Sequence, residues 1–170
     1  DIRMVYIALL SAAGLAAIDQ LIKFFAVTWL QDAGTVTLIP GLIDLVYVEN
    51  TGAAWGLFAG NTWLLVGVTS LAIIAAVVFM LMKKVQSPFL IWMISVVIGG
   101  GVGNLIDRIF RVDAAGNHFV VDYLNFSFID FPVFNFADCC VVIGMIAIVI
   151  YILFFDGKKD KETSQVISHE

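Results

Sequence analysis

Four long apolar stretches, separated by shorter polar segments, dominate the pattern of residues along the chain. They run approximately over residues 4–29, 63–82, 88–106 and 134–155, and the second and third contain no charged residue. Each reaches the roughly 20 residues that a helix needs to cross about 30 Å of hydrocarbon. The pattern therefore predicts an all-α membrane protein with four transmembrane helices.

The first apolar stretch also has to be compared with a cleavable signal peptide. Its apolar part is too long for one, and its later half carries Asp19, Gln20 and Lys23. Such residues do not suit the apolar core of a signal peptide, but they are expected of a helix that faces the interior of a bundle. We therefore expect a retained transmembrane helix.

The segment between the first two apolar stretches, residues 30–62, has a pattern of its own. Residues 37–39 and 43–48 have a strand-like composition, and Pro40-Gly41 between them indicates a turn. Residues 52–60 are small and aromatic, which suits the membrane–water interface. We expect a small extracytoplasmic β-sheet and a short interfacial helix, which together could cover the interior of the bundle.

Composition and the placement of basic residues extend this picture. Hydrophobic residues make up 61% of the chain and charged residues 14%, far outside the usual soluble range. Lys83 and Lys84 lie between the second and third stretches, and residues 158–161 hold three more lysines, whereas residues 30–62 hold no Lys or Arg. By the positive-inside rule, both termini are expected in the cytoplasm and the two longer connections outside.

The chain is expected to form one domain, because it has no linker long enough to separate two. Residues 1–155 would make a single integral membrane domain. Residues 156–170 are polar and lack apolar periodicity, which predicts a disordered cytoplasmic tail. Nothing in the net charge of −5 indicates nucleic-acid binding.

Two carboxylates lie next to apolar residues in the second half of the chain. Asp138 precedes the apolar run 139–155, and Asp122 lies within Val120-Val121-Asp122-Tyr123. An ionisable residue at the edge of hydrocarbon is costly, so it marks a candidate functional site. Two adjacent carboxylates cannot both stay ionised, so one can accept a proton from an attacking water while the other donates a proton. The chemistry alone leaves a catalytic and a structural role for the pair equally open.

Further polar residues occur near the same ends of the apolar stretches. Asp19 and Lys23 share a helix face, as do Asn104 and Arg108, and Asp107 could belong to the same cluster. Support of the helix ends is the favoured explanation of these residues, and a direct role in the reaction is the alternative. The set comprises Asp19, Lys23, Asn50, Asn104, Asp107, Arg108 and Asn135.

Other kinds of chemistry find little support in the sequence. Three serines lie in apolar stretches without a histidine partner, and the only histidines are His118 and His169. A zinc site needs a larger cluster of ligands, so we expect neither a metal nor a cofactor. Cys139 and Cys140 are neighbours that cannot easily form an unstrained disulfide, and they are best explained as small packing residues.

Taken in order, these motifs resemble bacterial lipoprotein signal peptidase, also called signal peptidase II. The resemblance covers nearly the whole chain, with four spans and the motifs Asp19-Gln20 with Lys23, Asn50 to Gly56, Gly99 to Arg108, Val121-Asp122-Tyr123 and Pro132 to Asp138. Each motif alone is weak, whereas the ordered set is very specific. Two departures stand out, because Tyr123 occupies a position where Phe is more usual and residues 111–118 form a longer link than usual.

The resemblance implies an aspartyl endopeptidase of the bacterial cytoplasmic (inner) membrane, with its active site near the outer face. It would remove signal peptides from diacylglyceryl-modified prolipoproteins by cleaving before the lipidated cysteine. Its partners would be these precursors and membrane lipid, with globomycin as an inhibitor, and the enzyme is expected to be a monomer. The family's catalytic pair falls on Asp122 and Asp138. Its substrate-binding or supporting residues fall on Asp19, Lys23, Asn50, Gly52, Asn104, Asp107, Arg108, Asn135 and Ala137.

Two non-enzymatic hypotheses compete with this one. A small transporter or proton relay would use acids distributed through the depth of the membrane. The cytoplasmic halves of the four stretches lack ionisable residues, which argues against a continuous path. A structural partner subunit would leave the convergence of acidic residues unexplained.

Overall fold

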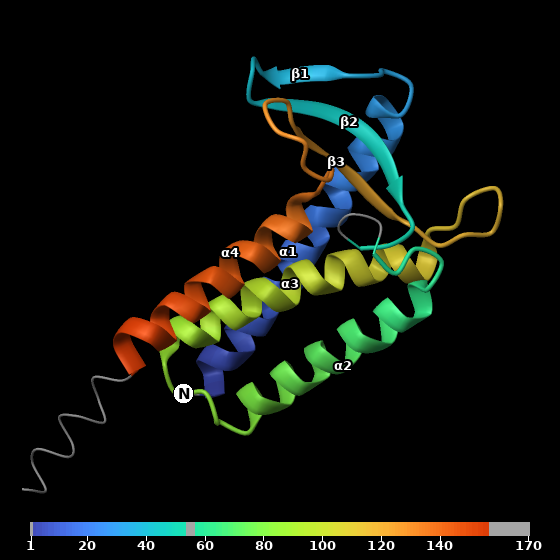
Figure 1. Cartoon of the computed structure of the whole chain (residues 1–170). Coiled ribbons are helices and arrows are strands. Elements are labelled where there is room, and N and C mark those ends of the chain that lie inside the picture. The colour runs from blue at the N-terminus through green and yellow to red at the C-terminus, as the bar shows by residue number, and fades with distance from the viewer. Residues whose placement is uncertain (1, 54–56, 157–170) are drawn as a thin grey trace, which may run out of the picture.

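The computed structural model describes residues 2–53 and 57–156, in which four long helices form one bundle (Figure 1). The helices are α1 (Ile2–Phe25), α2 (Thr62–Leu81), α3 (Pro88–Phe110) and α4 (Phe136–Tyr151), and the π-helical turns η1 (Ala26–Leu30) and η3 (Ile152–Asp156) extend α1 and α4. All four are long and apolar enough to cross a membrane. The prediction of a multi-pass membrane protein is thereby confirmed.

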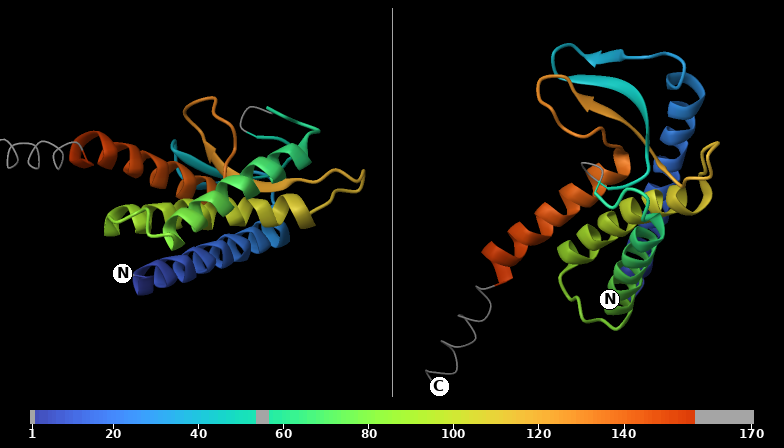
Figure 2. Two further views of the ribbon diagram at one scale, coloured as in Figure 1. Left: turned by 90° about the horizontal axis from the view of Figure 1, so that it is seen from below. Right: turned by 45° about the vertical axis from the view of Figure 1, so that its right-hand side comes forward.

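A three-stranded antiparallel sheet lies at one end of the bundle (Figures 1 and 2). Its strands are β1 (Val36–Ile39), β2 (Ile43–Asn50) and β3 (Val120–Phe126), in the spatial order β1-β2-β3. The first two form the predicted hairpin, in which Gly41 adopts a φ of 71° that favours glycine. The third strand was not predicted, because residues 120–126 lack a strict alternation of apolar and polar side chains.

Two predictions fall wholly or partly outside the described residues. The short interfacial helix was expected within residues 52–60, of which residues 54–56 are not described. The flanking residues 51–53 and 57–60 form bends and turns. The tail expected over residues 156–170 lies outside the described part, apart from residue 156 at the end of η3.

Helix α3 occupies the centre of the bundle, with α2 and α4 on opposite sides of it (Figure 2). Gly99 and Gly103 face α1, and a Cβ at Gly99 would lie 2.9 Å from the carbonyl oxygen of Ala12. Gly100 faces α4, where a Cβ would overlap the carbonyl oxygen of Ala137. Gly99 and Gly103, which are four residues apart on one face of the helix, therefore allow α3 to approach α1 closely.

One difference in helix length matters for the polar residues. Helix α3 continues to Phe110, whereas the predicted stretch ended at residue 106. Asp107 and Arg108 are consequently helical residues, and a step of about 100° per residue turns them to different sides of α3.

A small apolar cluster joins the sheet to the bundle. Val121 and Tyr123 of β3 pack with Ala26 and Leu30 of η1 and with Phe119. Since successive side chains of a strand point to opposite faces, this packing turns the intervening Asp122 to the other face of β3. The orientation of Asp122 thus follows from the burial of its two neighbours.

The close approach of α3 to α4 generates a stability prediction. Replacing Gly100 with Ala forces a methyl group against the backbone of Ala137, which should destabilise the protein by about 1–3 kcal/mol. Gly67→Ala in α2 is the matched control, because a Cβ there meets nothing within 4 Å. Thermal unfolding in detergent should show a lower midpoint for Gly100→Ala alone, and equal midpoints for the two variants would contradict this account.

Candidate active site

A fully buried lysine ties α1 to α3 at the sheet end of the bundle. The ammonium nitrogen of Lys23 lies 2.9 Å from Asp19 Oδ2 and 3.0 Å from Asp107 Oδ2, and all three side chains are 0% exposed. It also donates a hydrogen bond of 2.8 Å to the side-chain oxygen of Asn104. All three ammonium donors therefore have partners, as a buried charge requires.

Asp107 is the second centre of this network. Its Oδ1 accepts hydrogen bonds from Gln20 at 2.9 Å and from Arg111 Nε at 3.0 Å. Its Oδ2 accepts from the backbone N–H of Val121 at 3.0 Å, which anchors the start of β3. Asp107 and Asn104 thus meet at the Lys23 ammonium, in keeping with the cluster that their spacing suggested, whereas Arg108 lines the neighbouring cavity.

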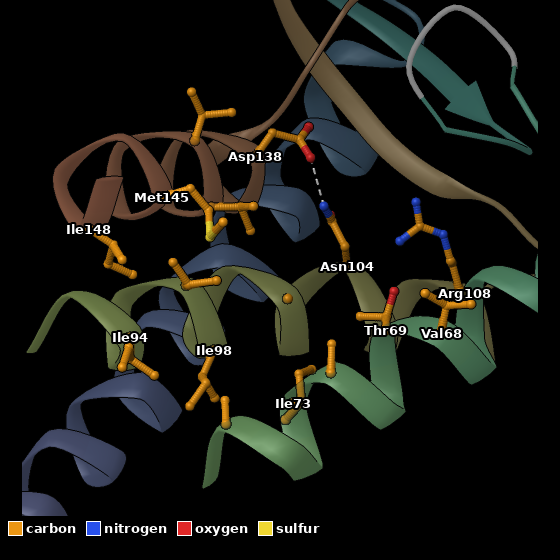
Figure 3. Close-up of a pocket in the computed structure, with 16 residues that line it drawn as sticks. Val68, Thr69, Ile73, Ile94, Ile98, Asn104, Arg108, Asp138, Met145 and Ile148 are labelled. Carbon is orange, nitrogen blue, oxygen red and sulfur yellow. Dashed lines mark hydrogen bonds between the residues drawn. The ribbon is translucent and has the colours of Figure 1, made fainter. Parts of the chain in front are cut away.

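Asn104 connects Lys23 to Asp138 by hydrogen bonds at both ends of its side-chain amide. Lysine can only donate, so the Asn104 side-chain oxygen must face Lys23 and its NH₂ group must point away. That NH₂ group donates to Asp138 Oδ1 at 2.8 Å, as Figure 3 shows across the cavity between α3 and α4. One buried cation therefore fixes the amide that holds this carboxylate.

Asn135 connects the two candidate catalytic carboxylates directly. Its side-chain NH₂ donates to Asp122 Oδ1 at 2.6 Å, while its backbone N–H donates to Asp138 Oδ2 at 3.0 Å. The side-chain oxygen in turn accepts from the backbone N–H of Asp138 at 3.0 Å. The last two bonds form a capping box at the start of α4, so the same residue begins the helix and spans the carboxylate pair.

Asn50 holds the second oxygen of Asp122 by the same arrangement. Its side-chain oxygen accepts from the backbone N–H of Gly52 at 2.9 Å, which turns its NH₂ group to Asp122 Oδ2 at 2.9 Å. A side chain at Gly52 would place its Cβ 2.7 Å from the carbonyl oxygen of Leu57. The glycine is thus needed for the tight turn that orients Asn50.

Ala137 adds a link between α4 and α1. Its backbone N–H donates to Asp19 Oδ1 at 3.1 Å. The Asp19 carboxylate therefore pairs with Lys23 through one oxygen and accepts a hydrogen bond from the first turn of α4 through the other. The side chain of Ala137 is fully buried. Gly100 of α3 lies against the carbonyl oxygen of Ala137, so the two helices approach closely at this residue.

Asp122 has the electrostatics of one member of a coupled pair. Burial, and next the negative charge of Asp138, raise the pKa of Asp122 to about 7. The hydrogen bonds from Asn50 and Asn135 and the charge of Lys23 act in the opposite direction but do not cancel this rise. A carboxyl group with this pKa can exchange a proton near neutral pH.

Three cavities meet at these residues. A cavity of about 520 Å³ lies between α2, α3 and α4, and Asn104, Arg108 and Asp138 line its polar end (Figure 3). A second of about 420 Å³ is lined by both Asp122 and Asp138. A third of about 410 Å³ continues past Asp122 along residues 48–53. The two carboxylates thus line one shared cavity, and each of them also lines one of the two neighbouring cavities.

Arg108 brings a positive charge to this shared space. Its guanidinium donates to the carbonyl oxygen of Gly52 at 3.4 Å and lines the same cavities as Asn104 and Asp138. Unlike Lys23, which lies beneath the carboxylates with no exposed surface, Arg108 can meet a molecule that enters.

The structure brings every candidate residue from the sequence to one region, but in two groups. One group hydrogen-bonds to Asp122 or Asp138 or lines their cavity, and it consists of Asn50, Asn104, Asn135 and Arg108. The other group forms the buried ion-pair cluster between α1 and α3, and it consists of Asp19, Lys23 and Asp107. The prediction missed Gln20 and Arg111 as partners of Asp107. The spacing of four between Asp107 and Arg111 was a usable signal for that pair.

Among the described residues, no group of three or more His, Cys, Asp or Glu side chains is placed to hold a metal ion. The polar groups that border the cavity of the two aspartates are carboxylates, side-chain amides and the Arg108 guanidinium.

Comparison with known families gives a consistent match. A sequence profile of the family described as Signal peptidase (SPase) II matches residues 11–154. The lipoprotein signal peptidase of Clostridium acetobutylicum is 41% identical over 146 residues, covering 84% of this chain and 91% of that protein. That of Clostridioides difficile is 40% identical over 144 residues, covering 85% and 93%.

Solved structures resemble the chain in three dimensions as well. A bacterial membrane enzyme determined by the in meso method at 2.3 Å superposes with a TM-score of 0.77 at 30% identity, covering 86% of this chain and 87% of that one. A second such enzyme, at 1.9 Å, has a TM-score of 0.75 at 30% identity, covering 87% and 93%.

The buried lysine generates a prediction about stability. Lys23→Met would leave Asp19 buried without a cation and Asp107 with Arg111 alone, which should destabilise the protein by about 3–5 kcal/mol. Lys84→Met is the control, because Lys84 is exposed in the loop between α2 and α3. Thermal unfolding in detergent measures both, and a Lys23→Met variant as stable as the control would refute the bracing role.

Proposed function

The chain belongs to the signal peptidase II family, and we propose that it cleaves its substrates with the aspartate pair Asp122 and Asp138. As a member of that family it is a membrane protease that removes signal peptides from prolipoproteins. The observation that carries the proposed mechanism is the joint position of the two carboxylates on one cavity, with Asn135 bonded to both.

In the proposed reaction the two carboxyl groups share one proton around a water molecule. The ionised group takes a proton from water as the water oxygen bonds to the carbonyl carbon of the scissile peptide. The protonated group gives its proton to the carbonyl oxygen. The C–N bond then breaks as a proton passes to the leaving nitrogen, which yields a carboxyl end and a free amine without a covalent enzyme intermediate.

The polar residues around the pair hold it in position for these transfers. Each catalytic carboxylate receives side-chain hydrogen bonds from asparagine amides whose oxygens are fixed by N–H donors. We assign substrate binding to Arg108 and to the backbone near Gly52, because both border the shared cavity. Asp19, Lys23 and Asp107 support the site without contacting substrate.

The cavities suggest how a lipid-modified precursor is bound. The cavity between α2, α3 and α4 has an apolar lining that begins at Asp138 and runs down the helices toward Ile148. Val142 lines both this cavity and the cavity of the two aspartates, Ile143 lines the latter, and both side chains are also exposed on the surface of the bundle. Apolar linings next to the aspartates suit a hydrophobic signal segment and acyl chains that remain in the bilayer.

The cleavage position follows from this arrangement as part of the proposal. If the signal segment and the acyl chains both stay among apolar residues, the peptide bond between them lies at the aspartates. That bond precedes the diacylglyceryl-modified cysteine. A precursor without the lipid would lack one of the two apolar anchors and should be a poorer substrate.

The placement in the cell is inferred from the distribution of lysine along the sequence. We propose a bacterial inner-membrane protein with both termini in the cytoplasm and the aspartates near the outer face. Residues 30–62, which hold β1 and β2, contain no Lys or Arg, whereas Lys83 and Lys84 follow α2 and three more lysines follow α4 in the sequence. A monomer suffices, since one chain supplies both aspartates. Inhibition by globomycin remains an expectation from the resemblance.

A proton relay or small transporter is the alternative function. It requires ionisable groups along the full depth of the bundle. Helix α2 contains no charged residue, and apart from Arg3 in the first turn of α1 the charged side chains of α1, α3 and α4 gather at the sheet end. Incubation of the purified protein with lipid-modified and unmodified precursors separates the two functions, because only a peptidase releases a signal peptide.

Replacing either aspartate tests the catalytic assignment. Asp122→Asn and Asp138→Asn should each lower the cleavage rate of a lipidated precursor by about a thousandfold or more, because each removes a proton acceptor or donor. Asp32→Asn, an exposed acid of the loop after η1, should cleave at the wild-type rate. Normal turnover by either of the first two variants would exclude the pair mechanism.

The pKa of Asp122 predicts how the rate depends on pH. Because burial and the charge of Asp138 raise this pKa to about 7, the singly protonated pair is still populated at neutral pH. As the pH rises through that value both groups ionise, the proton donor is lost, and kcat should fall. A pH–rate profile under conditions where the protein stays folded measures this, and a rate that keeps increasing well into the alkaline range would contradict it.

A further inference from the structure

Tyr123 lies next to Asp122 in β3, but its side chain points to the opposite, buried face of the strand. It is 5% exposed and packs with Ala26 and Leu30 of η1. Its hydroxyl oxygen accepts a hydrogen bond of 3.0 Å from the backbone N–H of Phe136, the first residue of α4. We propose that Tyr123 is a positioning residue, whose hydroxyl holds the start of α4, and with it Asp138, against the strand that carries Asp122.

The first turn of α4 shows why this contact matters. The first four N–H groups of a helix have no partner within the helix. Here each one has a partner from outside or from the cap. Asn135 donates to Asp138 Oδ2 at 3.0 Å, Phe136 to Tyr123, Ala137 to Asp19 at 3.1 Å, and Asp138 to Asn135 Oδ1 at 3.0 Å.

Each outside partner ties this turn to a different part of the fold. Asp19 ties it to α1, and Tyr123 ties it to β3. Backbone bonds reinforce the second link, because the N–H groups of Tyr123 and Leu124 both donate to the carbonyl of Phe134, at 3.0 and 2.8 Å. The backbone pairing joins the strand to the segment before α4. Within the described residues, the Tyr123 hydroxyl is the one group of β3 that hydrogen-bonds to the backbone of the helix itself.

Losing this one bond should affect geometry more than folding. A phenylalanine ring would keep the apolar packing of Tyr123, while the Phe136 N–H would lose its partner. Asp138 lies two residues further along, so a small movement of this turn changes its separation from Asp122. Proton transfer depends steeply on such distances, whereas the binding of a substrate with long apolar anchors does not.

A direct proton-transfer role for Tyr123 is disfavoured. Burial raises the pKa of the Tyr123 hydroxyl above its ordinary value, so it stays neutral in the range where Asp122 exchanges its proton. The hydroxyl also lies on the face of β3 away from the cavity that both aspartates line. Tyr123 therefore acts through the position of Asp138.

The test compares Tyr123→Phe with Tyr47→Phe on a lipidated precursor. Tyr47 belongs to the same apolar cluster but donates its hydroxyl to Glu49, at 3.0 Å, within β2. For Tyr123→Phe we expect kcat to fall roughly tenfold with KM within about twofold of wild type. The thermal midpoint should stay close to that of Tyr47→Phe, which should keep the wild-type kcat.

A pH–rate profile adds a readout that a purely structural role would not move. Around Asp122 the charged groups are Asp138, Lys23 and Arg108. If the start of α4 shifts away, the charge of Asp138 acts less strongly on Asp122, and the alkaline fall of kcat should move to lower pH. Tyr47→Phe should keep the wild-type profile.

The outcomes separate this inference from the proposed function on which it rests. Absence of cleavage by the wild-type protein would overturn the function itself. With an active wild type, an unchanged kcat and pH profile in Tyr123→Phe would overturn the positioning role. A loss of kcat that comes with a large fall in thermal midpoint and an unchanged profile would also overturn it, since that is the signature of general destabilisation.

Discussion

Lys23 places a positive charge at 0% exposure inside a bundle of apolar helices, where no water can compensate it. It is satisfied by two carboxylates and one amide, Asp19, Asp107 and Asn104, which come from α1 and α3. Few side-chain arrangements around such a buried charge are stable, because the loss of any partner leaves a buried polar or charged group unpaired. The rigid base of the candidate active site is a consequence of this constraint.

Lys23 also determines how the side chains around the catalytic pair are oriented, because an ammonium group can only donate hydrogen bonds. Lys23 sets the orientation of Asn104, which sets Asp138, while Asn135 and Asn50 hold Asp122 from two other elements. Asp138 is therefore held by Asn104 of α3, and Asp122 is held by Asn135 and Asn50, while both carboxylates line a cavity. This division suits a protease whose substrate enters from the bilayer, since the site can be preorganised while its mouth stays accessible.

Much of this arrangement could be predicted from the sequence, because hydrophobic length and local spacing are local properties. Four apolar stretches gave four helices, and Pro40-Gly41 marked the hairpin turn. The strand around Asp122 was missed because its neighbours alternate poorly. The spacing of Asn104 and Asp107 suggested one cluster, but not that the buried Lys23 lies between their side chains. The dual contact of Asn135 depends on β3 lying beside the start of α4, which no pattern along the chain encodes.

The central claim is that Asp122 and Asp138 share a proton near neutral pH. Infrared difference spectroscopy of the purified protein, titrated from acid to alkali, detects protonated carboxyl groups directly. The account predicts a carboxyl signal that disappears around pH 7 in the wild type and is shifted to lower pH in Asp138→Asn, where the neighbouring negative charge is gone. A wild-type protein with no protonated carboxyl near neutral pH, or an identical titration in Asp138→Asn, would contradict the shared proton.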